Sequence, residues 1–333
     1  MNVKRFIKRA GGSLCGSRLL APLVCSRVRN SINVVYYHFV GEPAPHYDAF
    51  YSGCTLECFS KDLERLVRVF TFAPLAEVIA SDGSARKPKI AVTFDDGFDL
   101  HQTGVMEVLA RFGVPATTFV ITSCVDNQAL MWRHKLSAIR SLAPKATCIA
   151  EYNKLAVGKS LPPIQSTGQL MDAASRWEMT TKDSLAAELW ENCSLQPLGE
   201  YLSAHKPYFS WDGLRRWLAA GHSVGFHTHS HPDCARLQAA DLEGELIGPA
   251  MNLKNKLNLK ELCLSYPFGS RLLRPLEDHI FSRNIFQAIF GIKGFRKKGV
   301  SNQRLERAGV EQDGVGWPVF AHSLLNGFAR NRD

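Results

Sequence analysis

The chain has 333 residues, enough for one large domain or two smaller ones, and its 45% hydrophobic and 21% charged residues are typical of a globular protein. The formal net charge of +9 is concentrated in residues 1–30, which hold seven Lys or Arg and no Asp or Glu. The rest of the chain is therefore close to neutral, which excludes a duplex-binding surface and with it a nucleic-acid partner.

Residues 1–30 are predicted to form a basic N-terminal extension. Its one apolar run, Leu19 to Cys25, is short, contains Pro22 and is followed by Arg27. This pattern disfavours a cleaved secretory signal, and a spanning helix needs about 20 apolar residues. Two interpretations stay open: a frayed tail, or a segment that makes peripheral contact with an anionic membrane.

The nine cysteines are odd in number and follow no framework spacing. We therefore expect reduced thiols in a cytoplasmic protein, located at the inner face of the membrane if the extension binds lipid. Cys54 and Cys58, with His46 upstream, suggest a zinc site as an alternative. A structural zinc site needs four ligands at tighter spacing, so buried or free thiols are the favoured interpretation.

Strands and helices alternate along the first part of the chain after the extension. Apolar runs and helical spacing predict a strand at 32–37, a helix at 59–70, a strand at 90–94, a helix at 105–112 and a strand at 114–121. Alternation of this kind with short loops is typical of a parallel α/β sheet or barrel.

Residues 123–207 interrupt this alternation. Helices are predicted at 132–142 and 184–193, joined by loops rich in Gly, Pro and Ser. We interpret the segment as an insertion that caps the barrel or shapes a substrate cleft. The alternation then resumes with a helix at 211–220, a strand at 222–226, a helix at 241–257, a strand at 262–266 and weaker strands at 286–290 and 305–310. The barrel is thus predicted over 31–310, with a C-terminal tail at 311–333.

Polar side chains follow three of the predicted strands. Asp95 and Asp96 end one strand, His227, His229 and His231 follow another, and 267–269 follow a third. The carboxyl ends of barrel strands meet at one face. Buried carboxylates there must be solvated, paired or bound to a cation, and carboxylate with imidazole suits a divalent metal such as zinc. The sequence therefore predicts hydrolysis at a metal.

Three motifs resemble those of the polysaccharide deacetylases, also called the NodB-homology or carbohydrate esterase family 4 enzymes. They are Thr93–Gly97 (TFDDG), Gly221–Pro232 (GHSVGFHTHSHP) and Ser265–Gly269 (SYPFG). The resemblance runs from about residue 33 to 310, with the insertion between the first two motifs. It implies a distorted (β/α) barrel of the NodB-homology type.

The resemblance also implies roles for individual residues. Asp96, His227 and His231 would hold a divalent metal, with zinc the expected ion, and Asp95 would be the general base. The backbone N–H of Phe268, between Pro267 and Gly269, would help to stabilise the oxyanion. The alternative is that the acids cap the turn at Gly97 and the histidines satisfy core hydrogen bonds, which leaves these groups without a joint purpose.

Two departures from the family pattern concern the acid–base groups. The family often has an arginine at the position of Ser265, where it orients the base, and Arg307 is the candidate to replace it. The family's general acid is usually a histidine in a late L-x-H motif, for which His322 is the nearest candidate. His38, after the first strand, either lines the predicted site at the carboxyl ends of the strands or is a buried structural histidine.

We predict a hydrolase that removes N-acetyl groups, in preference to O-acetyl groups, from a polysaccharide or lipid-linked glycan during biosynthesis of a cell-surface glycan. Two alternatives stay open. One is the same metal site acting on another acyl amide, as a deformylase or amidohydrolase. The other is an inactive deacetylase-like domain that binds glycans.

Overall fold

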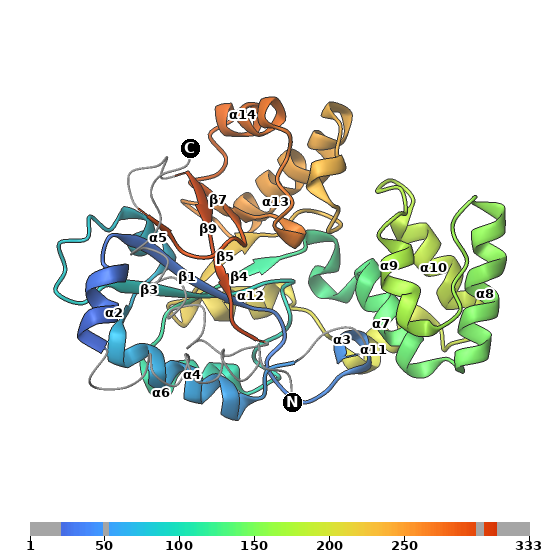
Figure 1. Ribbon diagram of the computed structural model, residues 1–333, viewed down its shortest axis with the longest axis horizontal. Helices are drawn as coiled ribbons and strands as arrows, with labels where there is room; N and C mark the ends of the chain where they lie inside the picture. The colour runs from blue at the N-terminus through green and yellow to red at the C-terminus, as the bar shows by residue number, and fades with distance from the viewer. Residues whose placement is uncertain (1–20, 49–52, 298–302, 312–333) are drawn as a thin grey trace.

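The computed structural model describes residues 21–48, 53–297 and 303–311 (Figure 1). His322 and residues 1–20 of the basic extension lie outside the described residues, so the predictions for them stay predictions. Helix α2 (Ala21–Val28) belongs to the described part of that extension. No described helix is both long enough and apolar enough to cross a membrane.

A parallel sheet curls into a nearly closed barrel. Its order is β10-β1-β3-β4-β5-β6-β7-β9, and every neighbouring pair on this path is parallel. Only Arg307 separates β9 from β10, so one stretch of chain pairs with β7 on one side and with β1 on the other. The predicted distorted (β/α) barrel is confirmed. The strands are β1 (Ser31–Tyr37), β2 (Thr71–Phe72), β3 (Lys89–Phe94), β4 (Ala116–Val120), β5 (Ser223–Phe226), β6 (Cys263–Ser265), β7 (Ala288–Gly291), β8 (Arg296–Lys297), β9 (Arg304–Glu306) and β10 (Ala308–Gly309).

Helices surround the barrel, with α13 and α14 above it and α4 and α6 below it in Figure 1. Helix α6 ends before Gly113, whose φ of 62° lies in the left-handed region that favours glycine. The barrel helices are α4 (Leu56–Val69), α5 (Leu75–Ala80), α6 (Val105–Phe112), α12 (Trp211–Ala219), α13 (Gly248–Lys256), preceded by a π-helical turn at Glu243–Ile247, and α14 (Arg274–Ser282). The short helix α3 (Pro45–Asp48) packs against the insertion and contributes to its core.

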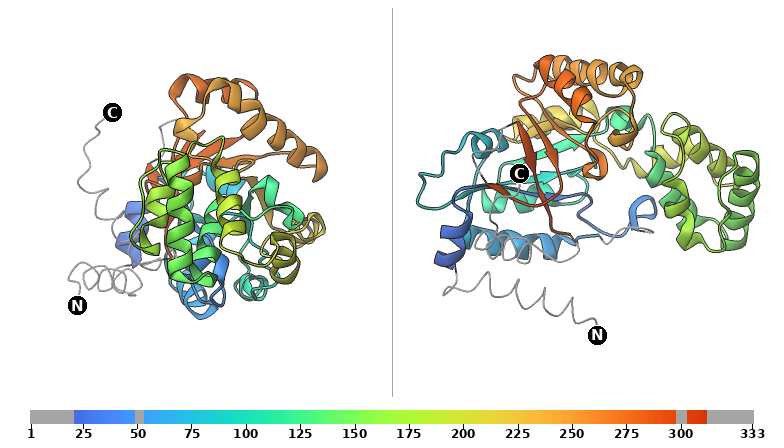
Figure 2. Two further views of the ribbon diagram at one scale, coloured as in Figure 1. Left: turned by 90° about the vertical axis from the view of Figure 1, so that its right-hand side faces the viewer. Right: turned by 45° about the horizontal axis from the view of Figure 1, so that its top comes forward.

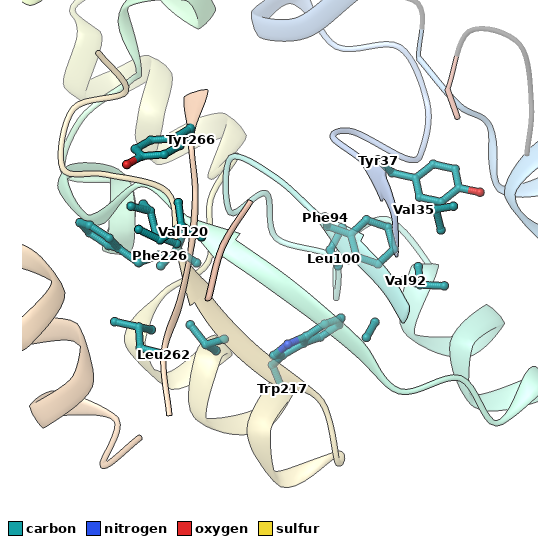
Figure 3. Packing of buried hydrophobic residues seen from close by; sticks show 14 of the residues in the cluster. Val35, Tyr37, Val92, Phe94, Leu100, Val120, Trp217, Phe226, Leu262 and Tyr266 are labelled. Atoms are coloured by element: carbon teal, nitrogen blue, oxygen red, sulfur yellow. The ribbon is translucent and has the colours of Figure 1, made fainter. Parts of the chain in front are cut away.

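Alternate residues of the barrel strands belong to two different apolar layers. Val35 and Val92 pack in the layer between the sheet and its helices, together with Phe94 and Trp217 (Figure 3). Their neighbour Ala91 belongs instead to a smaller cluster with Phe119 and other side chains of the remaining strands. Burial of each large apolar side chain contributes roughly 1.5–3 kcal/mol, so both layers hold the strand ends in fixed register.

The insertion is helical and has an apolar core of its own. It stands at the carboxyl ends of β3 and β4 (Figure 1, right) and faces the viewer in the left view of Figure 2. Trp177, Trp190, Tyr152 and Tyr201 are fully buried in this core. Its helices are α7 (Trp132–Leu142), α8 (Lys145–Gly158), α9 (Leu170–Ala174), α10 (Lys182–Asn192) and α11 (Leu198–His205).

Sequence patterns predicted α7 and α10 of the insertion but not α8, α9 or α11. The apolar residues of α8 do not fall on one face: Leu155 is buried, whereas Val157 is 83% exposed. A helix of this kind lacks the periodic signal on which the prediction depends.

Candidate active site at the carboxyl ends of the strands

The parallel barrel brings the three strand-end motifs to one face. β3 leads into Asp95 and Asp96, β5 leads into His227, and β6 leads into the turn at Pro267–Gly269. β4 lies between β3 and β5, and β6 is the next strand along the sheet. Segments that are more than a hundred residues apart in sequence are thus neighbours, as the prediction of converging strand ends requires.

Left-handed backbone conformations mark this face. Asp96, Thr228 and His231 have φ of 67°, 68° and 58°, although none is glycine. Such conformations cost of order 1–3 kcal/mol each and persist only where the surroundings enforce them. The Thr228 hydroxyl donates to the His227 carbonyl (2.5 Å) and accepts from the His231 N–H (3.0 Å). It therefore sets the loop that presents both histidines.

Asp96, His227 and His231 form a buried cluster whose ligand atoms all lie within 4.8 Å of one another. The Nε2 atoms of both histidines are 3.4 Å from Asp96 Oδ1. His227 Nδ1 donates to the Ser265 carbonyl (2.7 Å). Nε2 of the neutral ring therefore carries a lone pair, and this lone pair faces Asp96 Oδ1. Among the described residues, Asp96 Oδ1 has no hydrogen-bond partner although it is buried. Two lone pairs facing each other without a proton fit a cation between them.

The charge states of the cluster fit the same conclusion. Burial alone would raise the pKa of Asp96, but His134, His227 and His231 hold it well below its usual value. Burial lowers the pKa of His231 to about 3 despite the neighbouring Asp96 carboxylate. At neutral pH Asp96 is therefore a carboxylate and His231 a neutral imidazole, the forms that bind metals.

Asp95 is held by a buried arginine from the last barrel strand. Both carboxylate oxygens accept from Arg307, from Nη1 at 2.7 Å and from Nη2 at 2.7 Å. The guanidinium also donates to Thr93 Oγ1 (3.1 Å) and to Ser265 Oγ (2.5 Å). The structure thus places Arg307 in the barrel interior against Asp95, with the small hydroxyl of Ser265 leaving room for it.

Burial alone would raise the pKa of Asp95, but Arg307 and His227 hold it below its ordinary value. The Arg307 guanidinium lies over the rings of Tyr36 (4.8 Å) and Phe119 (5.0 Å). Since the pair is bidentate and enclosed by aromatic rings, the Asp95 carboxylate has one orientation and stays ionised at neutral pH.

His38 lies beside Asp95 at the same edge of the sheet. Tyr37 pairs with Phe94, and the Asp95 N–H donates to the Tyr37 carbonyl (2.8 Å), so His38 and Asp95 are the next neighbours in register. His38 Nδ1 is 2.8 Å from Glu311 Oε2. Burial alone would lower the pKa of His38, but Glu311, Asp96 and Asp95 raise it to about 9. Position after a strand was the only sequence signal for His38, and nothing in the sequence indicated its partner Glu311.

The third motif forms a tight turn beside His231. The Gly269 N–H donates to the Tyr266 carbonyl (3.0 Å), and Pro267 has no N–H. Phe268 is therefore the residue of the predicted group whose amide is a candidate oxyanion donor, and its φ of 58° is left-handed. Its ring stands edge-on to His231, with centroids 4.8 Å apart, and forms an apolar wall of the site.

Two further predictions concern side chains outside the cluster. His229 Nδ1 is 3.0 Å from Thr122 Oγ1, which directs it away from the metal ligands. Cys54 is buried and Cys58 exposed, and Asp96 with its two histidines is the one metal-competent group within the described ranges.

The insertion contributes two residues that sequence reasoning missed, both in the first turn of α7. Trp132 Nε1 donates to the His231 carbonyl (3.0 Å), and His134 Nε2 is 3.3 Å from Asp96 Oδ2. A Trp and a His in a helix of the insertion carry no motif, so no local signal would have identified them.

The sequence profile of the polysaccharide deacetylases matches residues 82–278. Two solved structures are similar in fold. IcaB from Ammonifex degensii has a TM-score of 0.54 and 18% identity, over 88% of this chain and 97% of that one. The deacetylase PplD from Streptococcus pyogenes, solved in complex with acetate, has a TM-score of 0.53 and 14% identity, over 84% and 92%. A comparison with curated protein sequences finds no significant match.

Proposed function

This chain belongs to the polysaccharide deacetylase family and is a hydrolase, and from that premise we propose that it removes N-acetyl groups from an acetylated glycan at a divalent metal site. The observation that carries the proposal is the convergence of the Asp96, His227 and His231 ligand atoms within 4.8 Å, directly beside the Asp95–Arg307 pair. A ligand set and a separately held base are what acyl-amide hydrolysis at a metal needs.

Asp96, His227 and His231 would hold the metal, and two imidazoles with one carboxylate suit zinc. When bound, zinc would supply Lewis acidity for the acetyl carbonyl and for a water molecule. His227 is already oriented for metal binding, because its hydrogen bond to the Ser265 carbonyl fixes the tautomer in which Nε2 is free to bind a metal.

Asp95 is proposed as the general base. It is ionised at neutral pH, and the bidentate contact with Arg307 fixes the direction in which it accepts a proton from water. Arg307 thus takes the place of the arginine that the resemblance predicted at position 265.

His38 is proposed as the general acid. Hydrolysis breaks the bond between the acetyl carbon and the sugar nitrogen, adds the hydroxyl of water to carbon, and requires a proton on the leaving nitrogen. A histidine whose pKa is raised to about 9 by Glu311 carries that proton at neutral pH. Its register position beside Asp95 brings the acid and the base to the same strand ends.

The Phe268 N–H is proposed to donate to the oxygen of the acetyl carbonyl as negative charge develops there. The Phe268 ring is 37% exposed and offers an apolar surface for the acetyl methyl group and the sugar ring. The buried Trp132 ring packs near it, with centroids 6.3 Å apart.

Acetate release from N-acetylated oligosaccharides tests the proposal, with wild type and Asp95→Asn compared after zinc loading. We expect release by the wild type, and a kcat for Asp95→Asn that is lower by about 10²–10⁴, the usual contribution of a general base, while bound zinc is unchanged. If zinc-loaded wild type releases no acetate from any oligosaccharide of the panel, the proposal fails and the glycan-binding alternative is favoured.

A further inference from the structure

His134 lies between a metal-ligand candidate and the core of the insertion. It belongs to the first turn of α7, is fully buried, and its two ring nitrogens contact different groups. Nε2 is 3.3 Å from Asp96 Oδ2, and Nδ1 is 2.6 Å from the Tyr208 hydroxyl. We propose that His134 is a positioning residue through which the insertion orients Asp96 for metal binding. This inference rests on the metal site proposed above.

The hydrogen-bond chain determines which ring nitrogen of His134 carries the proton. The Met131 N–H donates to the Tyr208 hydroxyl (3.1 Å), which leaves the hydroxyl proton to be donated elsewhere. Asp96 is a carboxylate and only accepts, so the proton of the neutral ring belongs on His134 Nε2, the nitrogen that lies 3.3 Å from Asp96 Oδ2. Nδ1 of the neutral ring then accepts from the Tyr208 hydroxyl. Met131 thus donates to Tyr208, Tyr208 donates to His134, and His134 directs its remaining N–H at the Asp96 carboxylate.

These contacts make the two oxygens of Asp96 different. Oδ2 is tied to the insertion through His134, whereas Oδ1 lies 3.4 Å from the Nε2 atoms of His227 and His231. Rotation of the carboxylate would break the contact with His134 and turn Oδ1 away from both histidines. The carboxylate is therefore preset to offer one oxygen, which is the usual effect of the groups that surround metal ligands.

The surroundings of His134 hold the ring still. Its ring lies 4.9 Å from the Phe98 ring and 5.9 Å from the Tyr208 ring, nearly parallel to the latter. Trp132, in the same helical turn, donates to the His231 carbonyl. Lys182, from α10, donates to Ser230 Oγ (2.7 Å). The insertion thus contacts both segments that carry the metal ligands, and His134 is its contact with a ligand side chain.

Zinc affinity, measured by competition with a chromogenic chelator on folded protein, tests the inference. His134→Phe keeps an aromatic ring but removes the donor, and we expect its zinc affinity to be weaker by about 10–100-fold, the usual effect of losing a group that supports a metal ligand. His134→Gln retains an N–H donor and an acceptor, so its affinity should stay close to that of wild type. The matched control is His46→Phe, since His46 is also buried and packs near Phe98, 6.2 Å between centroids, without contacting the metal-ligand cluster.

Each outcome is decisive. Wild-type affinity in His134→Phe overturns the inference, and so does a glutamine variant as weak as the phenylalanine variant, because the imidazole would then act as a ligand itself. If His134→Phe does not fold, Tyr208→Phe, which removes one oxygen atom, should weaken zinc binding in the same direction, and unchanged affinity overturns the inference. Wild type that binds no zinc refutes the proposed metal site, whereas zinc-binding wild type with an unaffected His134→Phe refutes only the role of His134.

Discussion

The barrel brings side chains to the candidate site through strand register, whereas the insertion reaches it through single side chains of one helix. Asp95 and His38 are neighbours because β1 and β3 pair in parallel, and Arg307 joins them from the stretch that closes the barrel. His134 and Trp132 contact the segments that carry the metal ligands, and both belong to helix α7, which is part of the separate core of the insertion.

This difference implies that the barrel and the insertion have different roles in the proposed reaction. Groups that would exchange protons with the substrate belong to the barrel, and groups that would hold the metal ligands in place belong in part to the insertion. Barrel substitutions should therefore change kcat, and insertion substitutions should change metal affinity or stability.

The strongest contrast is between two histidines, His38 at the end of β1 and His46 in the core of the insertion. We expect His38→Gln to lower kcat for acetate release by about 10²–10⁴, because it removes the proposed general acid. His46→Gln changes a buried histidine of the insertion core (4% exposed) and should leave kcat near the wild-type value. Equal losses in both variants would contradict the assignment of the acid to the barrel.

The pH profile sharpens the same assignment. Since Glu311 raises the pKa of His38 to about 9, the rate should fall as pH rises through about 9 and the proton is lost. Glu311→Gln removes the carboxylate that raises this pKa, so the alkaline limb of kcat should move to lower pH. An alkaline limb at the same pH in both proteins would argue that another group supplies the proton.

Two ion pairs offer a second contrast, measured as the free energy of unfolding in urea. Arg307→Met leaves Asp95 buried without a counter-ion, since their side chains are 0% and 4% exposed. We expect a loss of about 3–5 kcal/mol. Lys182→Met leaves Asp183 45% exposed and solvated, so the loss is one hydrogen bond to Ser230 and one half-exposed ion pair, together worth about 1–2 kcal/mol. Similar losses in the two variants would mean that the barrel pair is no more buried in solution than the insertion pair.

The smallest effect concerns the pH dependence of the insertion. Burial lowers the pKa of His46 to about 3, below its ordinary value of 6.5. The unfolded chain therefore binds a proton that the folded chain excludes, and stability that is complete above pH 6.5 falls as pH drops toward 3. The slope is at most about 1.4 kcal/mol per pH unit. His46→Phe should lose less stability between pH 6.5 and 4.5 than wild type, and parallel curves would contradict this.

The family resemblance and the barrel could be predicted because their signals are local. Ile90–Phe94 is a short apolar run that ends in two carboxylates, and strand ends of a parallel barrel meet at one face whatever the loops do. The structural comparisons and the family profile confirm both. The metal and base assignments for Asp96, His227, His231 and Asp95 stay predictions that their geometry supports.

The remaining parts depend on contacts that no local pattern contains. His38 and Glu311 are 273 residues apart in sequence, and His134 acts on Asp96 through the placement of a whole helix. Three insertion helices were missed because packing in the insertion's own apolar core, rather than helical periodicity of the sequence, determines their form. His322 lies outside the described residues, so its predicted role as acid stays open beside that of His38.

We propose that Asp96, with His227 and His231, binds a divalent metal, and that the neighbouring base, Asp95, does not bind it. Elemental analysis after loading with zinc and removal of excess metal tests this claim directly. Wild type and Asp95→Asn should each retain one zinc ion per chain, and Asp96→Ala should retain far less. Zinc retained in full by Asp96→Ala, or absent from wild type, would contradict the account.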